Sequence, residues 1–194
     1  MTKQIPFKKF QAVGNDFVVV PMEGFRKSYR TLARRICDRH MGIGADGLLV
    51  VANRPNPQGQ FGVRVINADG TEAEISGNGA RIAAAYLIGQ GRRAPRKPVF
   101  LKTKAGARKI VPLQVSSHDW VFEVDMGRPV RDPRRIPLRI MRITAPIFGF
   151  IPNARQGLMP VVVTSIGNPH CSVFVDNLTS VDFASLGAEI ERNS

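Results

Sequence analysis

The residue types best suited to chemistry lie in one turn, the segment 76–81 with the sequence SGNGAR. It places Ser76, a small residue of the size of a nucleophile, directly before a predicted helix. Gly77 and the glycine at position 79 permit tight backbone turns, and Asn78 tolerates unusual backbone angles. The first N–H groups of a helix and its positive dipole end bind carboxylates or phosphates. The segment therefore predicts an anion site with one side chain beside it.

Two interpretations of Ser76 compete. A cysteine at this position would have a lowered pKa and could act as a base near neutral pH. A serine hydroxyl is a poor base unless a neighbouring group takes its proton. Serine is, however, among the best helix N-caps. On physical grounds alone, the sequence favours Ser76 as a helix cap.

Three asparagines next to glycine-bearing turns are further candidates for ligand binding. Asn15 follows a glycine, Asn67 ends a predicted strand before an Asp-Gly turn, and Asn168 lies in a Gly-Asn-Pro-His turn. Side-chain amides donate and accept hydrogen bonds without net charge, which suits a zwitterionic small molecule. Each asparagine alone is equally compatible with an ordinary turn.

His170 follows one of these turns and could act as a general base or orient a carboxylate. A lone histidine is more often structural. Cys171 should face the opposite side of the same strand and pack in the core. Cys37 falls on the apolar face of a predicted helix, so we also expect it in the core. The two cysteines form no CxxC pair, and no metal site is predicted.

The candidate residues lie between strongly patterned segments. Residues 7–20 predict two strands around a turn at 14–16, and residues 27–40 predict a helix with one apolar face. Residues 78–88 are rich in alanine and apolar nearly all round, which indicates a buried helix. Further strands are expected at 48–51, 61–66, 98–104, 107–115 and 120–126.

The chain predicts two domains. Residues 127–138 are rich in proline and arginine and form the best candidate for a linker between a domain at 1–126 and one at 139–194. In the second domain we expect strands at 139–144, 160–166 and 171–175. A final helix is expected to begin near Thr179 or Ser180 as its N-cap.

Composition limits the partners. The chain has 194 residues, 43% of them hydrophobic, and a net charge of +13. The basic residues are dispersed and lack interleaved aromatic residues, so we expect no nucleic-acid binding beyond nonspecific charge. No stretch has the length of a transmembrane helix, and the first residues have no apolar signal core. A reduced, cytoplasmic protein without a membrane partner fits best.

Five stretches together resemble the diaminopimelate epimerase family, a family of cofactor-independent amino-acid racemases. They occur in the family's order and span most of the chain: residues 7–17, 38–47, 67–70, 76–81 and 167–171. The resemblance implies an α/β (α+β) fold of two similar domains. Each domain would be a curved, mostly antiparallel sheet around a central helix, with the substrate between the domains.

The resemblance also implies a mechanism without a cofactor. In members of the family, two catalytic cysteines, one from each domain, face opposite sides of the substrate α-carbon. One removes the proton and the other returns it. The resemblance places Asn15, Asn67, Asn168, Gly77 and Asn78 on the substrate and His170 beside the catalytic centre. Ser76 occupies the place of the first catalytic cysteine. The implied function is epimerisation of LL- to meso-diaminopimelate, impaired in a chain with this serine.

The chain also departs from the family's pattern at its end. The family's Cys-Gly-Ser/Thr-Gly turn does not occur in residues 177–194. We therefore expect an incomplete second domain, an exposed apolar face in that half, and oligomerisation; a homodimer is compatible with this expectation. The alternatives are a related racemase or isomerase of the same fold, or a catalytically silent homologue that binds anions or nucleic acid.

Overall fold

The computed structural model describes residues 4–23, 28–116, 119–136, 142–143, 148–153 and 157–191. The chain divides into two compact units, Met1–Met126 and Gly127–Ser194. Each unit has its own sheet, and the first unit has two hydrophobic clusters whereas the second has one.

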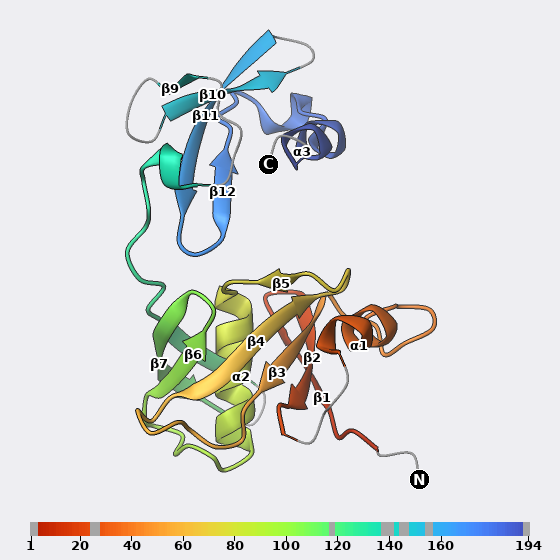
Figure 1. Ribbon diagram of the computed structural model, residues 1–194, viewed down its shortest axis with the longest axis vertical. Coiled ribbons are helices and arrows are strands. Elements are labelled where there is room, and N and C mark those ends of the chain that lie inside the picture. The colour runs from red at the N-terminus through yellow and green to blue at the C-terminus, as the bar shows by residue number, and fades with distance from the viewer. Residues whose placement is uncertain are drawn as a thin grey trace. The chain divides into compact units, whose positions relative to one another are not determined.

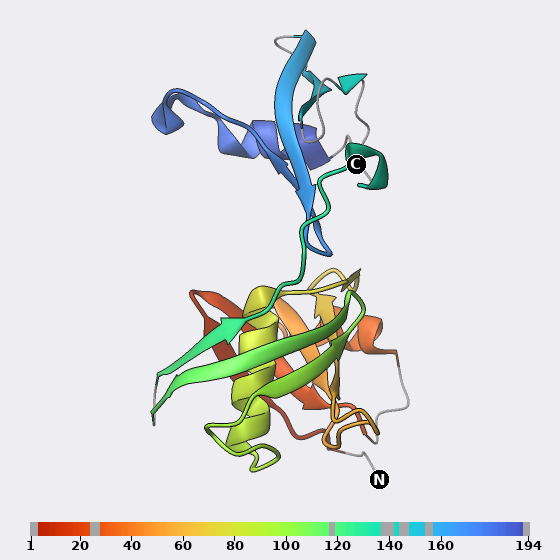
Figure 2. The same ribbon diagram turned by 90° about the vertical axis from the view of Figure 1, so that its left-hand side faces the viewer.

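A curved sheet surrounds a helix in the first unit (Figure 1). Only the β2–β3 and β4–β6 pairs of this sheet are parallel, and the other pairs are antiparallel. Helix α2 (Gly77–Gly89) contacts strands at both edges of the sheet, and Figure 2 shows strands in front of, behind and beside it. This confirms the predicted curved, mostly antiparallel sheet around a central helix for this unit. The strands, in sheet order, are β1 (Lys8–Ala12), β2 (Asn15–Pro21), β3 (Gly47–Val51), β4 (Phe61–Asn67), β6 (Val99–Thr103), β7 (Gly106–Val115) and β8 (Trp120–Val124), with β5 (Glu72–Ala73) paired to β4.

The central strands of this sheet are buried on both faces. In β2, Val19 packs toward α2, whereas Val18 and Val20 pack toward helix α1 (Tyr29–Ile36). All five residues of β3 are buried for the same reason. Helix α2 contributes four alanines to the inner cluster, so the surrounding strands can approach it closely there.

Helix α1 is shorter than the predicted helix at 27–40. It ends at Ile36, and the N–H of Cys37 donates to the carbonyl of Ala33. The carboxylate of Asp38 then accepts hydrogen bonds from the backbone N–H groups of His40 and Met41 at 2.8 and 2.7 Å. These bonds turn the chain out of the helix, because an aspartate side chain competes with the helical ladder.

The first turn also differs from the prediction. Val13 and Gly14 make it, with φ angles of 55° and 81°, and the Gly14 N–H donates to Gln11 Oε1 at 2.9 Å. Asn15 and Asp16 are consequently the first residues of β2 rather than turn residues. The strand pairing fixes their backbone.

The second unit has a four-stranded antiparallel sheet, whose strands in sheet order are β12 (Pro169–Ser172), β11 (Gly157–Ser165), β10 (Phe148–Asn153) and β9 (Arg142–Ile143). Helix α3 (Phe183–Glu191) packs Leu186 and Ile190 against a small cluster on β11. Of the strand expected at 139–144, residues 139–141 and 144 lie outside the described part of the chain.

Two boundaries in this unit differ from the prediction. Asn177 caps a 3-10 turn, η2 (Leu178–Ser180), and α3 begins only after Asp182. The strand expected at 171–175 ends at Ser172.

Two residues of the predicted linker pack within the second unit. Val130 pairs with Ser165, and Ile136 is buried in the cluster on β11 after the 3-10 turn η1 (Pro133–Arg135).

Candidate functional site

Ser76 is the N-cap of helix α2, as its side-chain chemistry favours. Its backbone is extended, and its Oγ accepts a hydrogen bond from the Gly79 N–H at 2.9 Å. The Ala80 N–H donates to the Ser76 carbonyl at 2.8 Å and starts the helical ladder. A Cβ on Gly79 would lie 3.1 Å from a methyl group of Leu49, so glycine lets the helix begin close to the sheet.

The start of α2 offers backbone donors. The first N–H groups of a helix have no acceptor within the helix. The Ser76 hydroxyl takes up that of Gly79, and among the described hydrogen bonds none takes up those of Gly77 and Asn78. Both residues are half-buried, and so is Ser76. Together with the helix dipole, these N–H groups can hold a carboxylate.

The side chain of Asn15 reaches this helix start from β2. Asn78 Nδ2 donates to Asn15 Oδ1 at 3.2 Å, and Arg81 in turn donates to Asn78 Oδ1. Asn15 Nδ2 donates to the carboxylate of Asp46 at 2.9 Å. Two of the residues expected to bind the substrate, 63 positions apart, are therefore in direct contact.

Asn15 is hydrogen-bonded to a cluster of charged side chains through Asp46. The guanidinium of Arg39 donates to Asp16 Oδ1 at 2.9 Å and to Asp46 Oδ1 at 2.8 Å. The ammonium of Lys9 lies 3.0 Å from Asp16. Hydrogen bonds from Arg39 hold the pKa of Asp16 well below its usual range. Donation from Asn15 and from the Asp16 backbone likewise lowers the pKa of Asp46. Both carboxylates are thus charged at neutral pH.

Asn67 lies at the end of β4, directly across from Gly47 in the sheet register. Its Nδ2 donates to Thr71 Oγ1 at 2.9 Å, and that hydroxyl donates to Asp69 Oδ1 at 2.7 Å. The Thr71 hydroxyl and N–H also lower the pKa of Asp69. The exposed Asn67 side chain is therefore oriented by the residues of the turn that follows β4. It lies across the sheet from Gly47, which directly follows Asp46.

A model of the diaminopimelate epimerase family matches residues 7–131 of the chain, a stretch that includes every site element described above. The chain belongs to the diaminopimelate epimerase family.

Individual relatives agree with this match. The diaminopimelate epimerase of Elusimicrobium minutum is 33% identical over 97% of the chain, and that of Carboxydothermus hydrogenoformans is 36% identical over 96%. The chain covers 66% of the length of each of these relatives.

Solved structures of epimerases and racemases share the fold. A hydroxyproline epimerase from Agrobacterium vitis has a TM-score of 0.62 at 15% identity. The match covers 94% of this chain and 53% of the epimerase chain. A probable proline racemase from Agrobacterium radiobacter K84 has a TM-score of 0.63 at 13% identity. The match covers 95% of this chain and 53% of the racemase chain. These two likenesses concern the fold alone.

The family's two other expected site residues lie in the second unit. Asn168 sits in the bend between β11 and β12, and His170 is exposed on β12. Cys171, the next residue, packs against the cluster on β11, as the alternation of a strand predicts. Ser76, Gly77, Asn78, Asn15 and Asn67 belong to the first unit.

Neither cysteine of this family member has the surroundings of a reactive thiol. Cys37 is 3% exposed, and burial raises its pKa to about 11. Burial also raises the pKa of Cys171. Both thiols therefore stay protonated at neutral pH, and the prediction that Cys37 packs in the core is confirmed.

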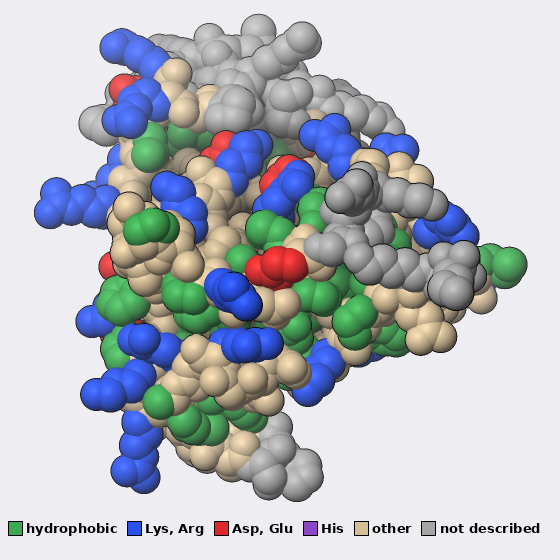
Figure 3. Space-filling view, turned by 60° about the horizontal axis from the view of Figure 1, so that its bottom comes forward, with side chains coloured by type: hydrophobic (Ala, Val, Ile, Leu, Met, Phe, Trp, Pro, Cys, Tyr) green, Lys and Arg blue, Asp and Glu red, His purple; other side chains and the backbone are tan. Residues whose placement is uncertain are grey.

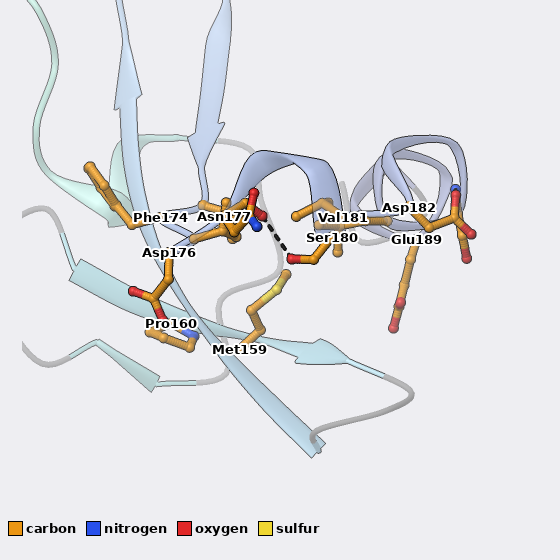
Figure 4. A pocket seen from close by; sticks show the side chains of 13 residues that line it. Met159, Pro160, Phe174, Asp176, Asn177, Ser180, Val181, Asp182 and Glu189 are labelled. Atoms are coloured by element: carbon orange, nitrogen blue, oxygen red, sulfur yellow. Dashed lines mark hydrogen bonds between the residues drawn. The ribbon is translucent and has the colours of Figure 1, made fainter.

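A cavity of about 470 Å³ lies in the second unit, and none of the expected site residues lines it (Figure 4). Apolar side chains such as Met159 line it together with the carboxylates of Asp176, Asp182 and Glu189. The Ser180 hydroxyl donates to the Asn177 carbonyl at its rim. The part of the chain that the structure describes holds no group of acidic, histidine or cysteine side chains able to bind a metal ion.

Lys and Arg side chains are spread over the face shown in Figure 3, among hydrophobic and other side chains. This distribution agrees with the dispersed basic residues of the sequence. None of the helices within the described ranges is both long and apolar enough to cross a membrane.

The sequence did not assign roles to Asp46, Arg39 or Arg81, although all three lie in or beside the family's motifs. Asp46 meets Asn15 because β2 and β3 pair in parallel, with Phe17 opposite Gly47. This pairing is not visible in the local sequence. The only local signal was the acidic residue that directly precedes a strongly apolar strand.

Proposed function

We propose that this chain carries one half of the substrate site of a cofactor-independent epimerase that interconverts LL- and meso-diaminopimelate. One observation supports the proposal above the others. The side chain of Asn15 contacts Asn78 in the first turn of α2, Ser76 caps that turn, and all three residues are half-buried. Membership of the diaminopimelate epimerase family adds the reaction.

In this proposal the N–H groups of Gly77 and Asn78 bind the substrate α-carboxylate. Removal of the α-proton places negative charge on the carbon and its carboxylate. Fixed donors at a helix start stabilise that charge more in the transition state than in the ground state. Asn15 and Asn67 bind other polar groups of the substrate through their amides.

Residue 76 is the position of the first base. A thiolate there would lie at the positive end of α2, where the helix dipole lowers a thiol pKa. The Ser76 hydroxyl has no neighbouring base among its described contacts and is used as an acceptor for the Gly79 N–H. We infer that the serine form binds the substrate and turns it over poorly.

The second unit supplies two further site residues in this proposal. Asn168 contacts the substrate, and His170 assists near the reacting carbon. The whole enzyme also requires a second base, which neither Cys37 nor Cys171 supplies because both pack against hydrophobic clusters.

The test is solvent deuterium exchange at the substrate α-carbon. We expect a Ser76→Cys chain, joined to the C-terminal third of the Carboxydothermus hydrogenoformans relative, to incorporate deuterium from D₂O into LL- and meso-diaminopimelate. The matched chimera with Ser76 should exchange far more slowly. Exchange with trans-4-hydroxy-L-proline but not with diaminopimelate would show that the chain acts on the substrate of another enzyme of the same fold. No exchange with any amino acid in a folded chimera would contradict the proposal.

We further propose a cytoplasmic protein that forms a homodimer and acts on a small-molecule amino-acid substrate. The two unpaired cysteines suit a reducing compartment. Exposed aromatic side chains in the second unit, Phe174 and Phe183, suit self-association. Sedimentation of the purified chain as a monomer at all accessible concentrations would contradict the dimer.

A further inference from the structure

A relay of side-chain hydrogen bonds runs from Asp46 to Arg81 through two amides. Asn15 Nδ2 donates to Asp46 Oδ2 at 2.9 Å, and Asn78 Nδ2 donates to Asn15 Oδ1 at 3.2 Å. Arg81 Nη2 donates to Asn78 Oδ1. The relay therefore connects the β2–β3 end of the sheet with the first turn of α2.

The chemistry of the two ends allows the relay only one direction. An ionised carboxylate accepts hydrogen bonds and cannot donate, whereas a guanidinium donates and cannot accept. Asp46 must therefore face the Nδ2 of Asn15, and Arg81 must face the Oδ1 of Asn78. The Asn15 oxygen then meets the Asn78 nitrogen. A flip of either amide would bring two donors or two acceptors together.

We propose that Asp46 and Arg81 are positioning residues that fix the orientation of the Asn15 and Asn78 carboxamides. This inference rests on the proposed function, in which both asparagines receive the substrate. Each Nδ2 carries two hydrogens and the relay uses one, so each amide keeps one N–H for a ligand. The relay thus leaves both amides as hydrogen-bond donors, like the first N–H groups of α2. Such donors suit a carboxylate oxygen.

The surroundings of Asp46 keep that end of the relay an acceptor. Arg39 Nη2 lies 2.8 Å from Asp46 Oδ1, and the Asp16 N–H donates to Asp46 Oδ2 at 3.1 Å. These donors and Asn15 lower the pKa of Asp46, so it stays ionised at neutral pH. Its side chain is 42% exposed, and water screens such a pair. Its main effect should therefore be on orientation rather than on stability.

Arg81 provides a matched pair of variants at the other end. In Arg81→Lys, the ammonium still only donates. In Arg81→Gln, the amide can donate or accept, so the direction of the relay is lost. Asp46→Asn removes the direction from the opposite end. Asp38→Asn is the control, because Asp38 is an exposed carboxylate of the same loop that caps the N–H groups of His40 and Met41 outside the relay.

The first measurement uses the unliganded chain and the side-chain amide resonances of Asn15 and Asn78 in ¹⁵N–¹H spectra. We expect Asp46→Asn to shift or broaden the Asn78 resonances, although residue 46 reaches Asn78 only through Asn15. Arg81→Gln should likewise change those of Asn15. Arg81→Lys and Asp38→Asn should leave the relay resonances close to their original positions. Unchanged Asn78 resonances in Asp46→Asn, and unchanged Asn15 resonances in Arg81→Gln, would overturn the proposal.

The second measurement is the affinity of the same variants for meso-diaminopimelate by calorimetric or NMR titration. We expect about tenfold weaker binding in Asp46→Asn and Arg81→Gln, the loss of roughly one hydrogen bond to a charged group. Arg81→Lys should retain binding within about twofold. Equal weakening by Arg81→Lys and Arg81→Gln would overturn the proposal. If the amide resonances respond as expected but the original chain does not bind diaminopimelate, the relay stands and the proposed function fails.

Discussion

The two units bury their helices in different ways. In the first unit, α2 is enclosed by strands, and nine of its residues are buried. In the second unit, α3 packs on one side of a four-stranded sheet, and none of its residues is fully buried. Phe174 and Phe183 of the second unit are 81% and 63% exposed.

This difference shows why the first unit can hold a precise site. Strands buried on both faces fix β2, β3 and the start of α2 against one another. Asn15 and Asn78 can then meet across 63 residues of sequence. A one-sided sheet gives less restraint, and its exposed apolar side chains are better suited to contacts with other surfaces.

The largest expected effect comes from enlarging a helix alanine in each unit. Ala83→Leu in α2 should lower the free energy of unfolding by about 2–3 kcal/mol, because Ala83 is fully buried against the sheet. Ala184→Leu in α3 should change it by less than about 0.5 kcal/mol, because Ala184 is exposed. Urea unfolding followed by fluorescence of Trp120, the single tryptophan and part of the first unit, measures the effect of Ala83→Leu, and far-UV circular dichroism of the whole chain measures that of Ala184→Leu. Similar effects of the two substitutions would remove the contrast between the helices.

A smaller effect is expected from the caps. Ser76→Ala removes the acceptor of the Gly79 N–H and should cost about 1 kcal/mol in the Trp120 transition. Asn177→Ala removes the cap of η2 in the second unit and should leave that transition unchanged. A Ser76→Ala chain as stable as the original would show that the hydroxyl does not cap α2.

The charge cluster in the first unit should make its stability depend on pH. The pKa of Asp16 is lowered in the folded chain, so its contribution is present above the unfolded pKa of about 3.9 and is lost as pH falls toward the folded pKa. At pH 7, Asp16→Asn should cost about 0.5–1 kcal/mol after screening by water. The difference between the two proteins should shrink as pH falls below about 4. A difference that is constant from pH 7 to pH 3 would contradict this account.

The smallest effect on stability is expected at the exposed aromatic residues. Phe174→Ser together with Phe183→Ser should change the unfolding free energy of the chain by less than about 0.5 kcal/mol. It should, however, weaken self-association in sedimentation velocity experiments. Unchanged association would place the contact between copies elsewhere.

The sequence predicted most of the first unit correctly because its signals are local. Three local patterns each identify one element: the apolar run at 48–51, the alternation of apolar residues at 61–66, and the alanine-rich segment at 78–88. The same holds for Ser76 as a cap, since capping depends on neighbouring residues.

Other features depend on pairing between distant segments and could not be predicted in this way. Asn15 was placed in a turn, but the β1–β2 register makes it the first residue of β2. The contact between Asn15 and Asp46 results from the parallel β2–β3 register. The two helix boundaries have local causes instead. The end of α1 at Ile36 follows from hydrogen bonds of Asp38 that helical periodicity does not reveal. At the start of α3, the Ser185 N–H donates to the Asp182 carboxylate.

The central claim is that the start of α2, together with Asn15, binds the carboxylate of an amino-acid substrate. The most direct test is a ¹⁵N–¹H titration of the 194-residue chain with meso-diaminopimelate. We predict saturable shift changes in the backbone amides of Gly77, Asn78 and Gly79 and in the side-chain amide of Asn15. Resonances of these groups that stay unchanged at millimolar ligand, or changes confined to the second unit, would contradict the account.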